Sequence, residues 1–225
     1  MQVAIVLYPG FTSLDVIGPY EVMGRLPGTE VVFVAERPGI VVNDLGNLSV
    51  DVVASLSDVP NPDVVLIGGG PGQADQMSDG VLHAWLRTVD RTSLWTTSVC
   101  TGSLILAAAG VLKGRRATSH WAALDHLGEF GVTPSKERVV IDGHYATAAG
   151  VSAGIDMALS LAGLQLGDDV ARTVQLIIEY APQPPYDAGS LESAPAEIVK
   201  MATERLSARF PDNRGNTGRT PPPSR

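Results

Sequence analysis

The sequence predicts an α/β fold in which helices cover both faces of a mainly parallel, doubly wound sheet. Short continuous apolar runs recur along the chain, as is typical of strands buried on both faces of a parallel sheet. Segments with a helical pattern lie between these runs, and such alternation indicates a doubly wound sheet. The predicted strands are Val3–Tyr8, Val31–Ala35, Val64–Ile67, Leu94–Val99, Val139–Ile141 and Tyr145–Ala148. The predicted helices are Ser13–Leu26, Asp79–Asp90, Gly102–Ala109, Ser119–Phe130, Ser152–Leu166 and Asp168–Tyr180.

Turn residues mark the ends of the early strands. Pro9-Gly10 closes the first strand, and the strand Val64–Ile67 runs directly into Gly68–Gly72. Glycine and proline interrupt regular structure, so both positions are expected to be tight loops. The segment Val41–Val50 contains two pairs of turn residues and predicts a small hairpin.

The C-terminal part changes character after the last of these helices. Pro182, Pro184 and Pro185 cannot continue a helix, so Gln183–Ser193 is expected to be a crossing loop. Ala194–Phe210 predicts a final helix. Residues 211–225 have almost no apolar side chains and are expected to be disordered. We therefore expect a single domain over residues 1–210.

The composition of the chain indicates which binding partners and which cellular compartment to expect. The chain has 225 residues, 44% of them hydrophobic, and a formal net charge of −8. An acidic surface repels phosphate backbones, so nucleic acid is not an expected partner. The N-terminus does not resemble a signal peptide, and no apolar run reaches the roughly 20 residues of a membrane-spanning helix. Because there is one cysteine, no intrachain disulfide can form, and we expect a cytoplasmic protein with a free thiol.

That cysteine, Cys100, lies between the predicted strand Leu94–Val99 and the predicted helix that begins at Gly102. A strand-to-helix turn of this kind is the arrangement of a nucleophile elbow. The helix N-terminus beside it is expected to lower the pKa of the thiol and to favour the reactive thiolate. Cys100 is therefore the candidate nucleophile, although a lone cysteine is more often a buried structural residue.

The glycine-rich loop Gly68–Gly72 follows a neighbouring strand. It matches neither a dinucleotide-binding fingerprint nor a phosphate-binding P-loop, so a nucleotide is not indicated. A loop at this place can bring an amide beside Cys100, and together with the Thr101 amide it would form an oxyanion hole. The alternative is a plain tight turn.

Two side chains elsewhere are candidates for proton transfer. Asp15, early in the first helix, either caps that helix or exchanges a proton with the substrate held at Cys100. His120 either pairs with the thiolate or packs on Trp121. The histidines and Cys100 show no metal-ligand spacing, so no metal is expected.

These motifs resemble the ThiJ/PfpI superfamily, which is related to the class I glutamine amidotransferases. The segments that carry the resemblance are Val64–Gly70, Val99–Ser103 and Ala117–Trp121. Within the superfamily the chain is similar to the isonitrile hydratases in Tyr8–Glu21, Gly150–Asp156 and Glu179–Tyr186. The resemblance covers residues 1 to about 210. It departs at Ala149, where relatives usually carry a glycine.

The resemblance implies a flavodoxin-like sandwich that forms a homodimer and uses no cofactor or metal. It implies an isonitrile substrate, R–N≡C, that is hydrated to an N-substituted formamide. Cys100 would attack the terminal carbon to form a thioimidate, and Asp15 would act first as acid and then as base for the water. The amides of Gly69, Gly70 and Thr101 would polarise the intermediate, and the Thr101 hydroxyl would hold the water.

Three other functions are open for a protein with Cys100 at this position, and they differ in the molecule that the cysteine would contact. Relatives that regulate transcription add a basic helix-turn-helix pair, for which an acidic chain that stops at Arg225 leaves no room. Amidases, peptidases and glyoxalase-like hydratases of this fold usually carry glutamate where Asp15 stands. A redox sensor would cycle the thiol through a sulfenic acid. Because the resemblance requires no His-Glu pair behind the cysteine, His120 is a weaker site candidate than Asp15.

Overall fold

The structure is a computed structural model that describes residues 1–209. The chain divides into two compact units, Met1–Ala181 and Pro182–Arg225. The first unit contains the main sheet and its covering helices, and the second contains a final helix, α6 (Ala196–Arg209). The expected single domain over residues 1–210 stays a prediction, and the expected tail at 211–225 lies outside the described residues.

The first unit is built on a seven-stranded sheet with the order β10-β11-β7-β6-β1-β2-β5. Neighbouring strands are parallel, except that β10 and β11 pair antiparallel. The predicted mainly parallel sheet is therefore confirmed. The strands are β1 (Gln2–Val6), β2 (Glu30–Ala35), β5 (Ala54–Ser55), β6 (Val64–Ile67), β7 (Trp95–Val99), β10 (Val139–Asp142) and β11 (Tyr145–Ala148).

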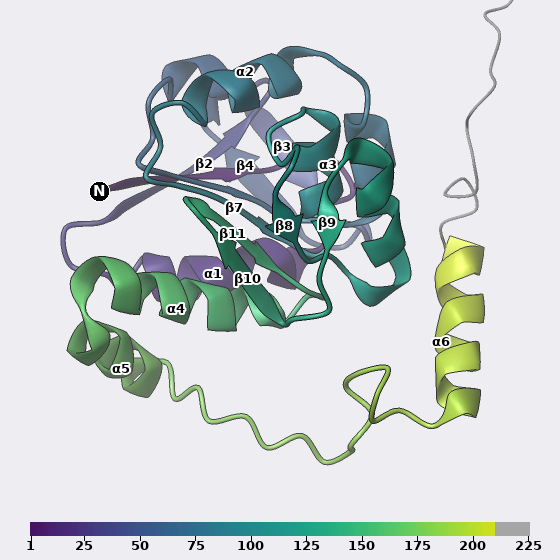
Figure 1. Cartoon of the computed structure of the whole chain (residues 1–225). Helices are drawn as coiled ribbons and strands as arrows, with labels where there is room; N and C mark the ends of the chain where they lie inside the picture. The colour runs from purple at the N-terminus through teal and green to yellow at the C-terminus, as the bar shows by residue number, and fades with distance from the viewer. Residues whose placement is uncertain (210–225) are drawn as a thin grey trace, which may run out of the picture. The chain divides into compact units, whose positions relative to one another are not determined.

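Helices cover both faces of this sheet, as the alternation in the sequence predicts. Figure 1 shows α1 and α4 on one face and α2 and α3 on the other, while α5 packs against α4. Their bounds are α1 (Ser13–Met23), α2 (Val81–Val89), α3 (Gly102–Ala108), α4 (Ala153–Leu166) and α5 (Asp168–Ile177). No helix among residues 1–209 combines the length and the apolar character needed to cross a lipid bilayer.

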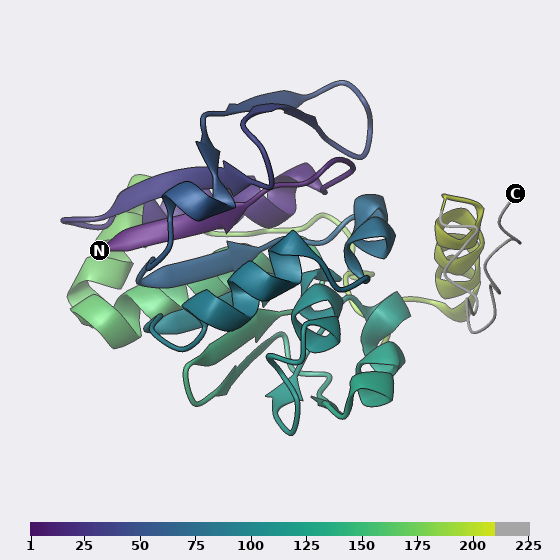
Figure 2. The same cartoon turned by 90° about the horizontal axis from the view of Figure 1, so that it is seen from above.

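Two small pairs of strands, one antiparallel and one parallel, lie outside the main sheet. The predicted hairpin is confirmed as β3 (Gly39–Val42) and β4 (Ser49–Val52), which pair antiparallel. Figure 2 shows this hairpin extending beyond the edge of the main sheet. The other pair is β8 (Arg116–Ala117) with β9 (Thr133–Pro134). Three short 3-10 segments complete the unit: η1 (Leu56–Asp58), η2 (Pro71–Gln76) and η3 (Trp121–Phe130).

The segment predicted as a helix from Ser119 to Phe130 is the main difference from the sequence-based fold. It forms the 3-10 turns of η3 instead of an α-helix and ends at Gly131 with φ 73°. Only Ala123 and Leu127 of η3 are buried. So narrow an apolar stripe gives an α-helix little packing energy, and most helical stability in proteins comes from packing.

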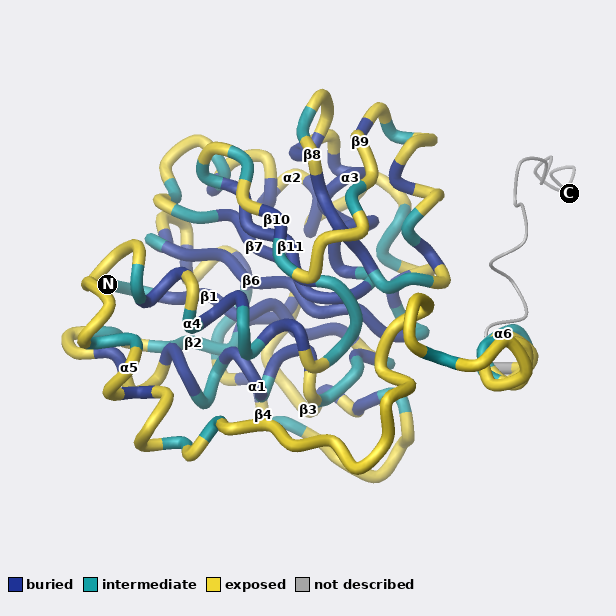
Figure 3. Tube along the Cα trace, turned by 60° about the horizontal axis from the view of Figure 1, so that its bottom comes forward, coloured by how far each residue is buried: buried dark blue, intermediate teal, exposed yellow. Residues whose placement is uncertain are grey.

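The central strands of the sheet end together at one edge, and this edge is where a site is expected. All of β6, and β1 apart from Gln2, is buried, and Figure 3 shows these central strands within the buried interior. Because β1, β6 and β7 are adjacent and parallel, their carboxyl ends meet at one edge. The chain leaves β1 toward β2 and leaves β6 toward β7, in opposite directions across the sheet. Such a reversal of strand order is where open α/β sheets bind ligands.

Candidate active site

Cys100 follows β7 directly and has the left-handed backbone conformation, with φ 58°. A residue with a side chain is strained in this conformation, and strain of this kind is typical of nucleophile elbows. Gly102 makes the sharp turn possible, because a Cβ there would lie 2.2 Å from the Ile67 carbonyl oxygen. The predicted strand-to-helix turn is therefore confirmed, and its cysteine is strained.

Hydrogen bonds hold the strained Cys100 peptide on both sides. The Cys100 N–H is shared between the carbonyl oxygens of Ala148, at 3.0 Å, and Ala149, at 2.9 Å. The Cys100 carbonyl oxygen accepts from the hydroxyls of Ser103 and Ser119, each at 3.1 Å. The conformation of Cys100 is thus fixed by α3, by the end of β11 and by the segment before η3.

Asp15 lies in the first turn of α1 with none of its surface exposed. Its Oδ2 accepts a hydrogen bond of 2.7 Å from the Gly69 amide, which follows β6. Its Oδ1 has no hydrogen-bond partner within residues 1–209. The N-cap of α1 is Thr12, whose hydroxyl donates to Asp44. The carboxylate of Asp15 is therefore turned toward the glycine loop and does not cap its own helix.

The charges of Asp15 and Cys100 are coupled. Burial raises the pKa of Asp15 to about 7, although the Gly69 hydrogen bond acts in the opposite direction. Burial also raises the pKa of Cys100, and the Asp15 carboxylate raises it further, while backbone hydrogen bonds from Thr101 and Val151 lower it. The expectation that the helix terminus leaves a thiol of lowered pKa is wrong, because desolvation outweighs the amides. At neutral pH the resting pair is a neutral thiol beside a carboxyl group that readily gains or loses a proton.

The glycine loop holds the other site residues through its amides. A Cβ on Gly69 would lie 2.4 Å from Thr101 Oγ1, so the loop contacts the elbow directly. The Gly70 amide donates to Thr101 Oγ1 at 3.1 Å, and the Gly69 amide donates to Asp15. We expected both amides to face a reaction intermediate, but in the structure both already donate within the protein. Each would have to leave its partner before it could join an oxyanion hole.

His120 packs on Trp121 and does not pair with the Cys100 thiol. Its ring lies 5.3 Å from that of Trp121 between centroids, and its Nδ1 accepts from the Ala122 amide at 3.3 Å. Burial lowers its pKa, which favours the neutral imidazole. Among the hydrogen bonds and ion pairs of the described residues, none joins His120 to Cys100. The ring instead lies against Gly150, where an added Cβ would be 2.9 Å from His120 Cδ2.

Three contributors to the site escaped the sequence-based analysis. Tyr8, buried beyond the end of β1, donates its hydroxyl to the Gly68 carbonyl oxygen at 2.7 Å. Val151 has φ 31°, an unusual conformation for a β-branched residue, and its amide bonds the Cys100 sulfur. Ser119 braces the elbow from 19 positions away. All three belong to motifs that carry the family resemblance, which was the available signal for them.

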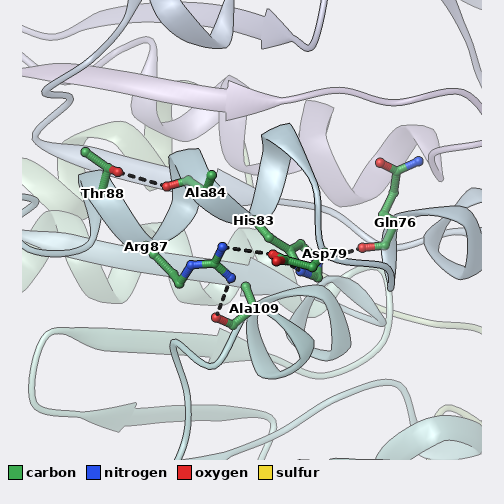
Figure 4. A network of polar contacts seen from close by, with 7 residues as sticks. All are labelled: Gln76, Asp79, His83, Ala84, Arg87, Thr88 and Ala109. Carbon is green, nitrogen blue, oxygen red and sulfur yellow. Dashed lines mark hydrogen bonds and ion pairs between the residues drawn. The ribbon is translucent and has the colours of Figure 1, made fainter.

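The far end of the glycine loop is tied to the helices on the other face of the sheet. The buried His83 of α2 bonds the Gln76 carbonyl oxygen through Nε2 at 2.8 Å (Figure 4). Arg87 of the same helix reaches Asp79 at 2.8 Å and the Ala109 carbonyl oxygen at 3.5 Å. This network anchors the segment that continues the loop. Across residues 1–209, no three potential metal ligands are grouped together.

The site places a buried cysteine at a strained elbow beside a buried carboxyl group, at the switch point of a parallel sheet in an α/β protein. The chain matches the DJ-1/PfpI family over residues 1–163 and belongs to that family. This membership agrees with the flavodoxin-like architecture that the motifs imply.

Relatives in this family have different activities. The chain is 42% identical over 207 residues to the isonitrile hydratase of Pseudomonas putida, which covers 92% of this chain and 90% of that protein. The structure of a ThiJ/PfpI family protein from Pseudomonas syringae superposes with a TM-score of 0.89 at 39% identity, covering 93% of this chain and 86% of that one. The HTH-type transcriptional regulator CdhR of Pseudomonas aeruginosa is 30% identical over 171 residues, 73% of this chain but 51% of the regulator. The chain is thus similar over nearly its whole length to a hydratase, and over 73% of its length to a regulator about twice as long as the matched part.

Proposed function

We propose that the protein is an isonitrile hydratase that adds water to R–N≡C and releases an N-substituted formamide. The observation that carries the proposal is the pairing of a neutral Cys100 thiol with a buried carboxyl group whose pKa is raised to about 7. General acid-base catalysis works best when the catalytic pKa lies near the working pH. The 42% identity to the Pseudomonas putida enzyme supports the same conclusion.

In the first step, Cys100 adds across the terminal carbon of the isonitrile. The thiol proton passes to the Asp15 carboxylate and from there to the terminal carbon, while the sulfur forms a bond to the same carbon. The product is a thioimidate, R–N=CH–S–Cys100, and Asp15 is again a carboxylate. The amides of Thr101 and Val151, which bond the sulfur, stabilise charge on it as the proton leaves.

In the second step, water replaces the sulfur. Asp15 takes a proton from the water while the water oxygen forms a bond to the thioimidate carbon. Asp15 then passes that proton to the imine nitrogen. The Thr101 hydroxyl, which accepts from Gly70, keeps its own proton free to hold the water. The C–S bond then breaks, the remaining hydroxyl proton returns to the sulfur through Asp15, and the formamide R–NH–CHO leaves.

Burial of the reacting groups fits a slender substrate. Cys100 is 6% exposed and Asp15 is not exposed at all. An isonitrile presents a single terminal carbon at the end of a linear group, which needs little room beside the sulfur. A branched carbonyl or a peptide bond needs more space on both sides of the attacked carbon.

The test is incubation of the purified protein with cyclohexyl isocyanide and detection of N-cyclohexylformamide by mass spectrometry. Cys100→Ala sets the background rate, and Glu21→Gln, which changes a half-exposed acid of the same helix, is the matched control for Asp15. Formamide from the wild type but not from Cys100→Ala supports the proposal. Turnover of methylglyoxal without any formamide would replace it with a glyoxalase-like activity.

The proposal includes a homodimer, which the family resemblance implies. Light scattering over micromolar concentrations should give twice the chain mass. A monomer mass across that range would remove the dimer from the proposal and leave the chemistry unchanged.

A further inference from the structure

One peptide group, between Gly68 and Gly69, lies between Tyr8 and Asp15. The Tyr8 hydroxyl donates to the Gly68 carbonyl oxygen at 2.7 Å. The N–H of the same peptide, on Gly69, donates to Asp15 Oδ2 at 2.7 Å. Both hydrogen bonds are buried. The two bonds therefore form a chain that begins at a phenol and ends at the proposed acid.

Hydrogen bonds that share a peptide group polarise one another. A donor at the carbonyl oxygen draws electron density away from the amide nitrogen, so the N–H becomes a stronger donor. A carboxylate that accepts a stronger bond is stabilised in its ionised form. Tyr8 can in this way control the charge of Asp15 through the Gly68–Gly69 peptide.

Two hydrogen bonds favour the ionised form of Asp15: the larger effect comes from the Gly69 amide and the smaller from the Cys100 side chain. Oδ1 of Asp15 has no hydrogen-bond partner within residues 1–209. The ionisable groups that face it are Cys100 at the elbow, Asp44 after β3 and the phenol of Tyr8. Burial, and then the charges of Asp15 and Cys100, raise the pKa of Tyr8 well above its usual value. The phenol therefore stays protonated and remains a donor throughout the neutral range.

We propose that Tyr8 is a positioning residue whose hydroxyl orients and polarises the Gly68–Gly69 peptide, so that the Gly69 amide holds the Asp15 carboxylate beside Cys100. The effect of Tyr8 on catalysis, through the charge of Asp15, rests on the proposed isonitrile hydration. The control of Asp15 by Tyr8 is a property of the resting protein and needs no substrate.

The test compares two changes at Tyr8 with opposite expected effects. Tyr8→Phe keeps the ring and deletes the donor, and should move the titration midpoint of Asp15 upward by about 0.5 pH unit. Ring-fluorinated tyrosine at position 8 is a stronger donor and should move the midpoint downward. The midpoint is read by NMR from carboxyl-labelled aspartate in the full chain, and the signal of Asp15 is identified by its loss in Asp15→Asn.

A matched control deletes another buried hydroxyl that donates to a main-chain carbonyl. Thr97 of β7 donates to the Val65 carbonyl oxygen at 2.8 Å, inside the sheet. Thr97→Val has nearly the same shape and should leave the Asp15 midpoint unchanged. If both Tyr8→Phe and Thr97→Val move the midpoint equally, the effect is general loosening and the proposal is overturned.

The acidic limb of kcat/KM against pH provides the link to catalysis and should move with the NMR midpoint. Midpoints that are the same in all Tyr8 variants overturn the inference, even when the protein hydrates isonitriles. Shifted midpoints in a protein that forms no formamide uphold the control by Tyr8 and remove the proposed function. If Tyr8→Phe does not fold, the fluorinated protein decides alone: a downward shift supports the inference and no shift overturns it.

Discussion

Cys100 and Asp15 lie side by side in the site but are held in opposite ways. Cys100 is held by its backbone, which is strained and bonded at both the N–H and the carbonyl. Asp15 belongs to a regular helix, and its carboxyl group bonds the Gly69 amide and the Cys100 side chain, both from other parts of the chain. The position of Cys100 is fixed by its peptide, whereas the environment of Asp15 sets the pKa of its carboxyl group. Removing a bond to the Cys100 peptide should therefore lower stability at every pH, whereas changing Asp15 should alter proton transfer and the pH dependence of stability.

The largest expected effect comes from Asp15→Asn, which tests the charge side of this comparison. We expect formamide production to fall by roughly 100- to 10,000-fold, the usual contribution of a general acid-base group. We also expect the variant to be more stable. The carboxyl group ionises near 3.8 when unfolded and near 7 when folded, so the wild type loses stability as the pH rises through this window.

The stability gain of Asp15→Asn should itself depend on pH. It should reach up to about 4 kcal/mol at pH 8 and fall to about 1.5 kcal/mol at pH 5. Urea unfolding at the two pH values measures both figures. Equal stability of the two proteins at pH 8, together with unchanged turnover, would show that Asp15 has only an architectural role.

The next effect is the pH dependence of the wild type. In the proposed first step Asp15 must be able to accept the thiol proton, so its protonation stops the reaction. Below pH 7, kcat/KM should fall about tenfold for each pH unit, reaching about 100-fold at pH 5. Rates with cyclohexyl isocyanide between pH 5 and 8 provide the measurement. A flat profile over this range would mean that another group carries the proton.

A smaller effect tests the backbone side of the comparison. Ser103→Ala and Ser119→Ala each remove one donor to the Cys100 carbonyl and should each cost about 1 kcal/mol of stability. The double variant should lose about 1 to 2 kcal/mol more than the sum, because the buried carbonyl then has no donor. A double-mutant cycle by thermal or urea unfolding tests this coupling. Strict additivity would show that the two hydroxyls do not brace the elbow together.

The smallest expected effect is that of His120→Phe. The new ring can still pack on Trp121, and only the bond from the Ala122 amide is lost. Stability should change by about 0.5 kcal/mol and turnover by about threefold or less. Turnover is measured against the wild type with the same isocyanide. A loss comparable to that of Asp15→Asn would make His120 the proton carrier and overturn the assignment of Asp15.

The sequence was a good guide to elements that depend on local pattern. Strands such as Val64–Ile67 were found because burial on both faces leaves an unbroken apolar run. The turn at Cys100 was found because a strand and a helix meet there. The segment Ser119–Phe130 was assigned incorrectly, since its length suited a helix but its packing, which the sequence does not show, did not support one.

The electrostatics of the site could not be predicted in the same way. The helix beside Cys100 was visible in the sequence, but the burial that reverses the shift in its pKa was not. The bond from Tyr8 to Gly68 joins residues 60 positions apart, and no local pattern links them. Candidate groups can thus be found along a chain, while their protonation depends on long-range contacts.

Two close approaches in the site limit how the protein can be redesigned. A methyl group on Gly69 would lie 2.4 Å from Thr101 Oγ1, and one on Gly102 would lie 2.2 Å from the Ile67 carbonyl oxygen. Contacts this short leave no room for any side chain on these parts of the loop and the elbow. A library that aims at bulkier isonitriles should therefore leave both glycines unchanged and vary residues that contact the R group instead.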